Sequence, residues 1–299
     1  PPQPLPPGIA PEMLRAVFQP IFRLATSEVL GYEALLRGPV GTAMESPAAL
    51  FATAQDAASA IALELTAAQI AIHAFSAMRL PGKLFLNFSA AGVRRLLEDH
   101  ASMLHTIADH DLHPSRIVIE LTEQTPISDL ATFAHELSVA RDFGLQCALD
   151  DFGTGNANLN LLIELTPDFI KLDKYFVRDI AKHPAKLDVA RSLQQILKGA
   201  ATSIIAEGLE TDDELGVVRD LGIRFGQGFF LGRPQDEPAT EISAQAAHVL
   251  QSTQIAVFPQ AVRVGWRAIT ASKLLRVAPT LSIRSSNDDV LHLFNRQPD

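Results

Sequence analysis

Eight apolar segments with the character of β-strands recur along the chain, and helix-patterned stretches rich in alanine and leucine separate most of them. The segments lie at residues 17–22, 29–36, 83–89, 116–123, 145–152, 168–176, 202–210 and 224–232. Strands that alternate with helices predict a parallel sheet covered by helices, and eight strands close a (β/α)8 barrel. We therefore expect a barrel. An open doubly wound sheet is the alternative, although no glycine-rich phosphate fingerprint follows the first strand.

The first two strand segments break this alternation. Only the short stretch RLATSE, residues 23–28, joins them. A parallel pair needs a crossover of a dozen or more residues, so these two strands should be antiparallel. The predicted fold class is α/β: a modified TIM (β/α)8 barrel with an antiparallel first strand and a short C-terminal helical extension.

The chain divides into three parts by composition. We expect a Pro-rich linker and lead-in helix at 1–17, the barrel at 18–236 and a C-terminal extension at 237–299. Within the extension, the segment SKLLRVAPTLSIRSSNDDVLHLF resembles the opening of a CBS domain. The alternative is a simple helical extension that packs on the barrel. With the CBS-like opening, we expect a fragment of a longer regulatory protein.

The charge and the single cysteine limit the partners and the compartment. The formal net charge is −9 and there is no lysine-arginine block, so a DNA or RNA duplex is an unexpected partner. Cys147 stands alone in an apolar run, which excludes an intrachain disulfide and fits the cytoplasm. We see no signal peptide and no uninterrupted apolar run of about 20 residues. We expect no membrane contact within these residues, although the parent protein could be membrane-anchored.

Polar and charged side chains gather where the predicted strands end. Because chemistry in a (β/α)8 barrel is built at the carboxyl ends of its strands, these residues are the candidates for a site. They are Glu33, Asn87, Glu120, Glu123, Asp150, Asp151, Lys171, Asp173, Glu207, Glu210 and Gln227. Buried carboxylates are costly unless they are paired or bind metal, and one lysine cannot neutralise them all. A divalent metal is the simplest explanation.

The adjacent pair Asp150 and Asp151 is the sharpest feature of this set. One interpretation is an ordinary capped turn, because Asp, Gly and Asn are common in turns. The other is that each carboxylate binds a different cation. Oxygen ligands without cysteine or clustered histidine favour Mg²⁺ or Mn²⁺ over zinc. Two such ions about 3.5–4 Å apart activate water for attack on phosphorus.

Seven motifs along the chain, taken together, resemble the EAL-domain phosphodiesterases. They are YEALLRG (32–38), LNFS (86–89), ELTE (120–123), DDFGTG (150–155), IKLD (170–173), AEGLET (206–211) and QGFFLGRP (227–234). The resemblance implies a metal-dependent hydrolase of cyclic di-GMP that produces linear pGpG. It also implies two bound ions, Mg²⁺ or Mn²⁺, a modified (β/α)8 barrel and a homodimer.

The resemblance assigns roles to residues at matching positions. The implied metal ligands are Glu33, Asn87, Glu120, Asp150, Asp151 and Glu207, with Asp150 shared between the ions. The implied catalytic residues are Lys171, which holds the attacking water, Glu207 as a general base, and Gln227 near the metal-bound water. The implied substrate contacts are Arg37 to a phosphate and Gln19 and Asp173 near guanine. Glu123 and Glu210 are implied to steady the loop after the fifth strand.

Several alternatives stay open at this point. Lys171 could serve as a buried counter-ion, and Arg37 could form a surface ion pair. The loop residues Asn156-Ala157-Asn158 depart from the Tyr-Ser-Ser usual in the family. We therefore keep a catalytically weak cyclic di-GMP receptor as the alternative function. A dimerising scaffold without ligand is disfavoured, because the unmetallated acids would repel one another.

Overall fold

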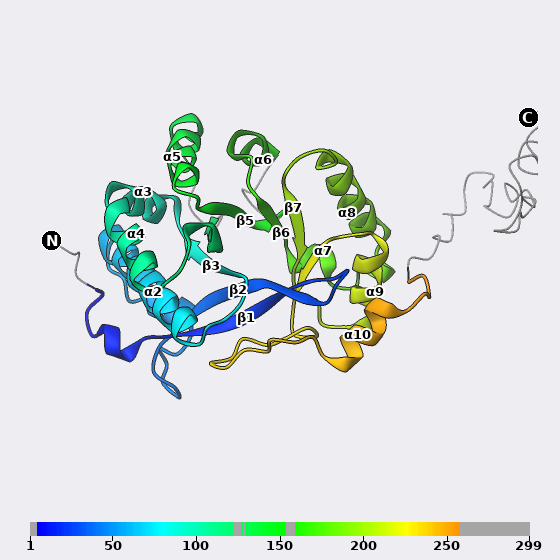
Figure 1. Cartoon of the computed structure of the whole chain (residues 1–299), viewed down its shortest axis with the longest axis horizontal. Helices are drawn as coiled ribbons and strands as arrows, with labels where there is room; N and C mark the ends of the chain where they lie inside the picture. The colour runs from blue at the N-terminus through cyan, green and yellow to red at the C-terminus, as the bar shows by residue number, and fades with distance from the viewer. Residues whose placement is uncertain (1–4, 122–126, 128, 154–158, 257–299) are drawn as a thin grey trace, which may run out of the picture. The chain divides into compact units, whose positions relative to one another are not determined.

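The computed structural model describes residues 5–121, 127, 129–153 and 159–256. The chain divides into two compact units, residues 1–258 and 259–299, and the described residues belong to the first unit. Eight strands form a closed barrel in which spatial order follows chain order (Figure 1). The closed barrel confirms the preferred prediction, and the open doubly wound sheet is wrong.

The strands confirm the antiparallel opening. Strand β1 (Arg15–Arg23) pairs antiparallel with β2 (Glu28–Arg37) and, through three residue pairs, with β8 (Phe225–Gln227). The other neighbours in the barrel are parallel. The remaining strands are β3 (Lys83–Phe88), β4 (Ile117–Leu121), β5 (Gln146–Phe152), β6 (Phe169–Leu172) and β7 (Ser203–Ala206). Because β1 and β2 are the longest strands, their ribbon continues past the ends of the others.

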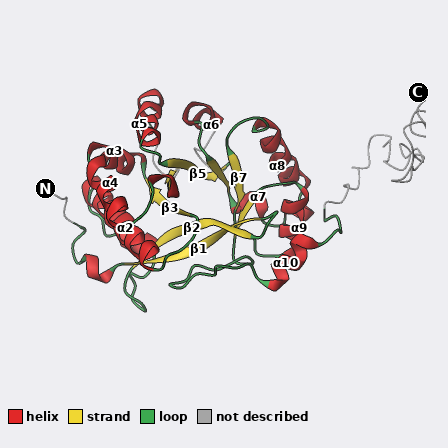
Figure 2. Ribbon diagram, in the orientation of Figure 1, coloured by secondary structure: helices red, strands yellow, loops and turns green. Residues whose placement is uncertain are grey.

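Helices surround the barrel (Figure 2). They are α1 (Pro47–Phe51), α2 (Ala57–Ala77), α3 (Ala90–Glu98), α4 (His100–Asp109), α5 (Leu130–Asp142), α6 (Leu159–Leu165), α7 (Lys174–Val177), α8 (Pro184–Ile196), α9 (Asp212–Asp220) and α10 (Ala244–Gln251). The chain between β2 and β3 forms two helices, α1 and α2. The break comes at Asp56, whose side chain accepts from the Ser59 amide in a capping box and starts α2. Where a lead-in helix was expected, there is a single 3-10 turn, Pro11–Met13, before β1.

Helix α2 is apolar and long enough, by length and composition, to cross a bilayer. This was not anticipated from the sequence, because Glu64 interrupts the apolar run. The helix packs against β1 and β3, and Leu63, Ile72 and Phe75 on its inner face are fully buried. These contacts are those of a helix in the shell of a barrel.

The barrel interior holds one layer of apolar side chains. Its members are Ile21, Leu30, Phe85, Val118, Ala148, Phe169, Ile205 and Phe225. A larger apolar cluster fills the space between the outer faces of the strands and the helices. The inner layer fills the barrel below the carboxyl ends of the strands. The side chains just above this layer therefore form the bottom of the site.

Candidate active site and metal centre

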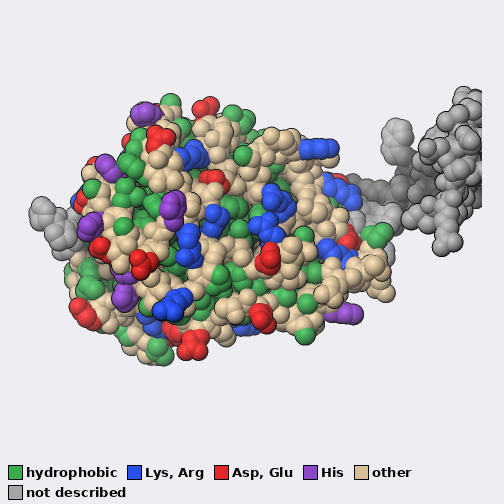
Figure 3. Space-filling model, viewed as in Figure 1, with side chains coloured by type: hydrophobic (Ala, Val, Ile, Leu, Met, Phe, Trp, Pro, Cys, Tyr) green, Lys and Arg blue, Asp and Glu red, His purple; other side chains and the backbone are tan. Residues whose placement is uncertain are grey.

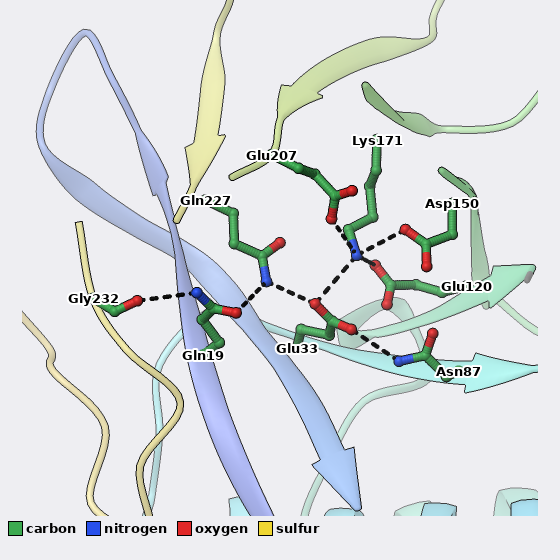
Figure 4. Close-up of polar contacts among 9 residues, drawn as sticks. All are labelled: Gln19, Glu33, Asn87, Glu120, Asp150, Lys171, Glu207, Gln227 and Gly232. Atoms are coloured by element: carbon green, nitrogen blue, oxygen red, sulfur yellow. Dashed lines mark hydrogen bonds and ion pairs between the residues drawn. The ribbon is translucent and has the colours of Figure 1, made fainter. Parts of the chain in front are cut away.

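Polar side chains cover the apolar layer at the end where the parallel strands have their carboxyl termini. Alternate residues of a strand face the same side, so the residue two positions from an interior apolar residue also points inward. The pairs, interior residue first, are Ile21 and Gln19, Phe85 and Asn87, Val118 and Glu120, Ala148 and Asp150, Phe169 and Lys171, Ile205 and Glu207, and Phe225 and Gln227. Glu33 of β2 lies opposite Gln19 in the ladder. The barrel thus gathers residues from eight separate strands into one cluster (Figure 4).

Lys171 lies at the centre of this cluster, with 1% of its side chain exposed. Its Nζ is 2.8 Å from Glu207 Oε1 and 3.0 Å from Asp150 Oδ1. It is also 3.1 Å from Glu120 Oε1 and 3.2 Å from Glu33 Oε2. One ammonium group therefore faces four carboxylates, and the expected counter-ion role of Lys171 is present in the structure.

The cluster has too little positive charge for its acids. Burial by itself would lower the pKa of Lys171, but the surrounding carboxylates raise it well above its ordinary value. Burial raises the pKa of Glu207 to about 8 against the opposing effect of Lys171. Burial likewise raises the pKa of Glu120 well above its ordinary value. Lys171 stays charged while Glu120 and Glu207 resist ionisation, so further cations would stabilise the cluster.

Unpaired oxygens show that the cluster fits divalent metal. Both carboxylate oxygens of Glu120 and Oδ1 of Asp150 are buried and accept no well-directed hydrogen bond, although two of these atoms lie within ion-pair distance of Lys171. One oxygen from each of Asp150, Asp151 and Glu207 lies within 4.8 Å of the others. Buried carboxylate oxygens whose hydrogen-bonding capacity is not filled are the ligands that Mg²⁺, Mn²⁺ or Ca²⁺ accept.

Glu33 is oriented by two side-chain amides. Asn87 donates to its Oε1 at 3.0 Å, and Gln227 donates to its Oε2 at 2.6 Å. Gln227 also donates to Gln19 Oε1 at 3.2 Å, and Gln19 donates to the Gly232 carbonyl at 3.1 Å. Burial would raise the pKa of Glu33, but Lys171 and the two amides lower it below its ordinary value. These contacts therefore hold Glu33 in its ionised form.

A register shift in β5 lies between Leu149 and Phe152, where the two adjacent aspartates stand. Asp151 has a φ of 49°, in the left-handed region, which a short polar side chain tolerates better than most. Burial raises the pKa of Asp151 to about 7, with Asp150 and a hydrogen bond to Asp173 adding to the rise. Asp173 also caps α7 by accepting from the Tyr175 amide at 2.6 Å. Asp173 thus connects β5 to α7 in addition to any contact with guanine.

Two predicted residues lie away from the cluster, and others lie outside the described residues. Arg37 ends β2, and its Nη1 donates to the Leu36 carbonyl at 2.8 Å. The Glu210 amide donates to Glu214 at 2.9 Å, which fixes the start of α9, while the Glu210 side chain is exposed. Glu123 and the loop residues Asn156-Ala157-Asn158 fall outside the described residues.

Glu64 was missed by the motif comparison. It lines a cavity of about 590 Å³ beside Glu33 and Asn87, together with Leu35 and Phe51. Its Oε2 accepts from both the amide and the hydroxyl of Ser89 at 3.1 Å. The signal in the sequence was one acid inside an otherwise apolar helical stretch of about 20 residues.

Histidine plays no part in this cluster. Histidine side chains are visible on the surface, mostly on the left of the face in Figure 3. Two of them, His73 and His110, contact each other at 3.0 Å between ring nitrogens. The histidines that the structure describes are exposed or partly exposed.

Comparison with known proteins gives a consistent result. The family described as "EAL domain" matches residues 5–234. A cyclic di-GMP phosphodiesterase of Pseudomonas aeruginosa is 32% identical over 231 residues, which are 75% of this chain and 38% of the relative. An uncharacterized protein of Mycobacterium tuberculosis is 30% identical over 238 residues, 76% of this chain and 37% of the relative. The chain thus spans less than two fifths of the length of these curated relatives.

Solved structures extend the likeness to the fold. BlrP1 of Klebsiella pneumoniae, in a complex with calcium and cyclic di-GMP, has a TM-score of 0.71 and 29% identity, covering 79% of this chain and 59% of that chain. A standalone EAL protein of Vibrio cholerae in its c-di-GMP bound form has a TM-score of 0.70 and 22% identity, covering 78% of this chain and 97% of that one. With its closed barrel and a family match over most of its length, the chain belongs to the EAL domain family and has its TIM-barrel fold.

Proposed function

We propose that this chain is a metal-dependent phosphodiesterase that hydrolyses cyclic di-GMP to linear pGpG. The observation that carries the proposal is the set of buried carboxylate oxygens that accept no well-directed hydrogen bond, on Glu120 and Asp150, beside Asp151 and Glu207. The Pseudomonas relative named as a cyclic di-GMP phosphodiesterase supports the substrate. The BlrP1 complexes with calcium or manganese and the cyclic dinucleotide support both substrate and metal.

The donor set is sufficient for two ions, Mg²⁺ or Mn²⁺. One ion would be held by Glu33, Asn87, Glu120 and Asp150, and the second by Asp150, Asp151 and Glu207. When bound, such ions neutralise phosphate charge and lower the pKa of a bound water. The register shift in β5 turns the two aspartates toward one rim, which is what a shared site requires.

The remaining steps fall to the side chains. Lys171 donates a hydrogen bond to the attacking water and holds it in line with phosphorus. Glu207, 2.8 Å from the same ammonium, accepts the proton that the water loses. The water oxygen forms a new bond to phosphorus, the bond between phosphorus and the 3′ oxygen breaks, and that oxygen takes a proton from solvent. The product is the linear dinucleotide with a 5′ phosphate.

The cavity beside Glu33 fits one guanine base. Guanine offers two adjacent N–H donors along one edge, which a carboxylate can accept. Glu64 supplies a carboxylate on the cavity wall, while Leu35 and Phe51 supply apolar contact for the ring. Gln19 and Asp173 are assigned to the guanines as well, and Arg37 to a phosphate. Glu123 and Glu210 are assigned to the loop after β5.

A product assay tests the proposal. The purified chain is incubated with cyclic di-GMP and Mg²⁺ or Mn²⁺, with and without a chelator, and the nucleotides are separated by chromatography. Metal-dependent formation of pGpG is expected. Tight binding without product would instead identify a receptor, and a chain that neither binds nor cleaves would refute both functions.

The assembly and the surroundings of the barrel are proposals too. We assign a homodimer in the cytoplasm, with residues 237–299 as a C-terminal extension of the barrel. Light scattering at several concentrations tests the dimer, and a monomer throughout would refute it. Fractionation of cells that express the full-length protein tests the location of the barrel.

A further inference from the structure

Two histidines connect helices α2 and α4 in the shell outside the barrel (Figure 1). His73 lies on the exposed side of α2, and His110 is the residue at which α4 ends. His73 Nδ1 is 3.0 Å from His110 Nε2, and the two rings are nearly perpendicular. Histidine is concentrated in this part of the sequence, because four of the nine lie within residues 100–113. The pair takes no part in the proposed reaction, so it needs an explanation of its own.

His110 is held in one orientation and one tautomer. Its ring Nδ1 is 2.8 Å from the Thr106 carbonyl, and a carbonyl only accepts, so Nδ1 carries the proton. Its backbone carbonyl accepts from Ser76 Oγ of α2 at 2.7 Å, which ties the end of α4 to α2. Nε2 of the neutral ring therefore presents a lone pair toward His73. A histidine whose other ring nitrogen donates to a backbone carbonyl is the usual arrangement of a metal ligand.

His73 is the adjustable partner in this contact. Because His110 Nε2 carries no proton, the proton between the two rings belongs to His73 Nδ1. His73 is exposed, so its ring exchanges protons with solvent. When Nδ1 releases its proton and Nε2 takes one, the ring stays neutral and two lone pairs face each other across the same gap. Those lone pairs repel, and a cation that takes the place of the shared proton removes the repulsion.

We propose that His73 Nδ1 and His110 Nε2 bind a transition-metal ion that prefers tetragonal geometry, Cu²⁺ or Ni²⁺. With metal–nitrogen bonds of about 2.0–2.1 Å, nitrogens 3.0 Å apart subtend about 95° at the ion. This is close to the right angle between neighbouring ligands in tetragonal complexes and well below the tetrahedral angle of zinc sites. Among the described residues, the pair has no third histidine, cysteine or carboxylate ligand within reach, so water completes the coordination.

This site differs in chemistry from the carboxylate cluster of the barrel. Imidazole nitrogen suits copper, nickel and zinc, whereas carboxylate oxygen suits magnesium and manganese. The two sites therefore select different ions, and Mg²⁺ in excess leaves the histidine pair open. An ion bound to both rings joins α2 to α4, so it stabilises the folded state in proportion to the logarithm of its concentration.

Copper as a paramagnetic probe tests the site. One equivalent of Cu²⁺ is added to the untagged chain in excess Mg²⁺, and pulsed electron paramagnetic resonance counts the imidazoles bound to copper. Two are expected in the wild type and at most one in His73→Gln. Calorimetry with Ni²⁺ should show a dissociation constant raised at least about tenfold in His73→Gln, since losing a ligand costs no less than losing its supporting partner. His135→Gln, at an exposed histidine of α5, is the matched control and should behave as the wild type.

The outcomes separate the metal site from a simple hydrogen bond between helices. Fewer than two imidazoles on copper in the wild type overturns the proposal, whether or not any variant folds. An unchanged Ni²⁺ affinity in His73→Gln, or an equal loss in His135→Gln, overturns it as well. Tighter binding of Zn²⁺ than of Ni²⁺ would refute the tetragonal assignment. None of these measurements requires turnover, so the site is tested even if the chain does not cleave cyclic di-GMP.

Discussion

At the scale of one residue, Lys171 affects both stability and the proposed reaction, because it is the buried cation among four carboxylates. Removing one member of a buried charged cluster leaves the others uncompensated, at a cost of about 3–5 kcal/mol. We expect Lys171→Met to lower the melting temperature strongly in chelator and much less in Mn²⁺, because the ions then supply the positive charge. Turnover should be nearly abolished while cyclic di-GMP still binds.

Scanning fluorimetry with and without metal checks this prediction for Lys171. Lys83→Met is the control, because Lys83 donates to the Ser115 carbonyl at 2.9 Å, away from the cluster. Its effect on the melting temperature should be the same in both conditions. A metal-independent effect of Lys171→Met would refute the electrostatic role.

Glu64 should make stability depend on pH. Burial raises its pKa above the ordinary value, although hydrogen bonds from Ser89 oppose the rise. A carboxyl group with a raised folded-state pKa favours folding at low pH and loses that contribution as the pH rises through its folded-state pKa. We expect Glu64→Gln to match the wild type near pH 4 and to be the more stable protein at pH 8.

Urea titrations across this pH range measure the difference between Glu64→Gln and the wild type. The same variant should raise KM for cyclic di-GMP, because an amide accepts only one of the two guanine donors that a carboxylate accepts. If the difference in stability between Glu64→Gln and the wild type does not change with pH, then ionisation of Glu64 does not destabilise the folded protein.

At the scale of elements, the sequence predicted the order and direction of the strands, but it did not predict the register shift in β5 or the surroundings of Glu64. The short connection at residues 23–28 predicted the antiparallel start, and the structure confirms it. In a regular strand, Asp150 and Asp151 would point to opposite faces. The register shift that brings both to the rim depends on pairing with β6, which local sequence does not encode. Glu64 was missed for a similar reason, since its environment comes from α2 packing beside β3.

The turn after β7 packs closely against the start of α7, and a glycine makes this close approach possible. Gly208 has a φ of 64°, and a Cβ there would overlap Lys174 at the start of α7. We expect Gly208→Ala to destabilise the protein by about 1–3 kcal/mol and to weaken metal binding by displacing Glu207. Gly199→Ala is the control, because its φ is 94° but nothing lies within 4 Å of the added Cβ. If both variants lose the same stability, then the positive φ alone causes the loss and the contact with Lys174 does not contribute.

At the scale of the whole molecule, metal should act as a stabilising ligand. An ion that binds only the folded state raises stability with the logarithm of its concentration. We expect Mn²⁺ to raise the melting temperature progressively above that in chelator. Asp150→Asn with Asp151→Asn should remove this shift and also raise the melting temperature in chelator, because two repelling charges are lost.

The antiparallel first strand changes the face of the barrel at which a preceding domain would be joined. In a regular (β/α)8 barrel the first strand starts at the face opposite the chemistry, whereas here β1 starts at the face that carries the site. Arg15 and Gln19 therefore stand directly after the point where the chain enters the barrel. A domain joined ahead of residue 15 would therefore meet the barrel at the rim that carries the candidate site, where β1 joins β8 through three residue pairs. The fold thus places the entry of the chain into the barrel one strand away from Glu33, a residue proposed to bind metal.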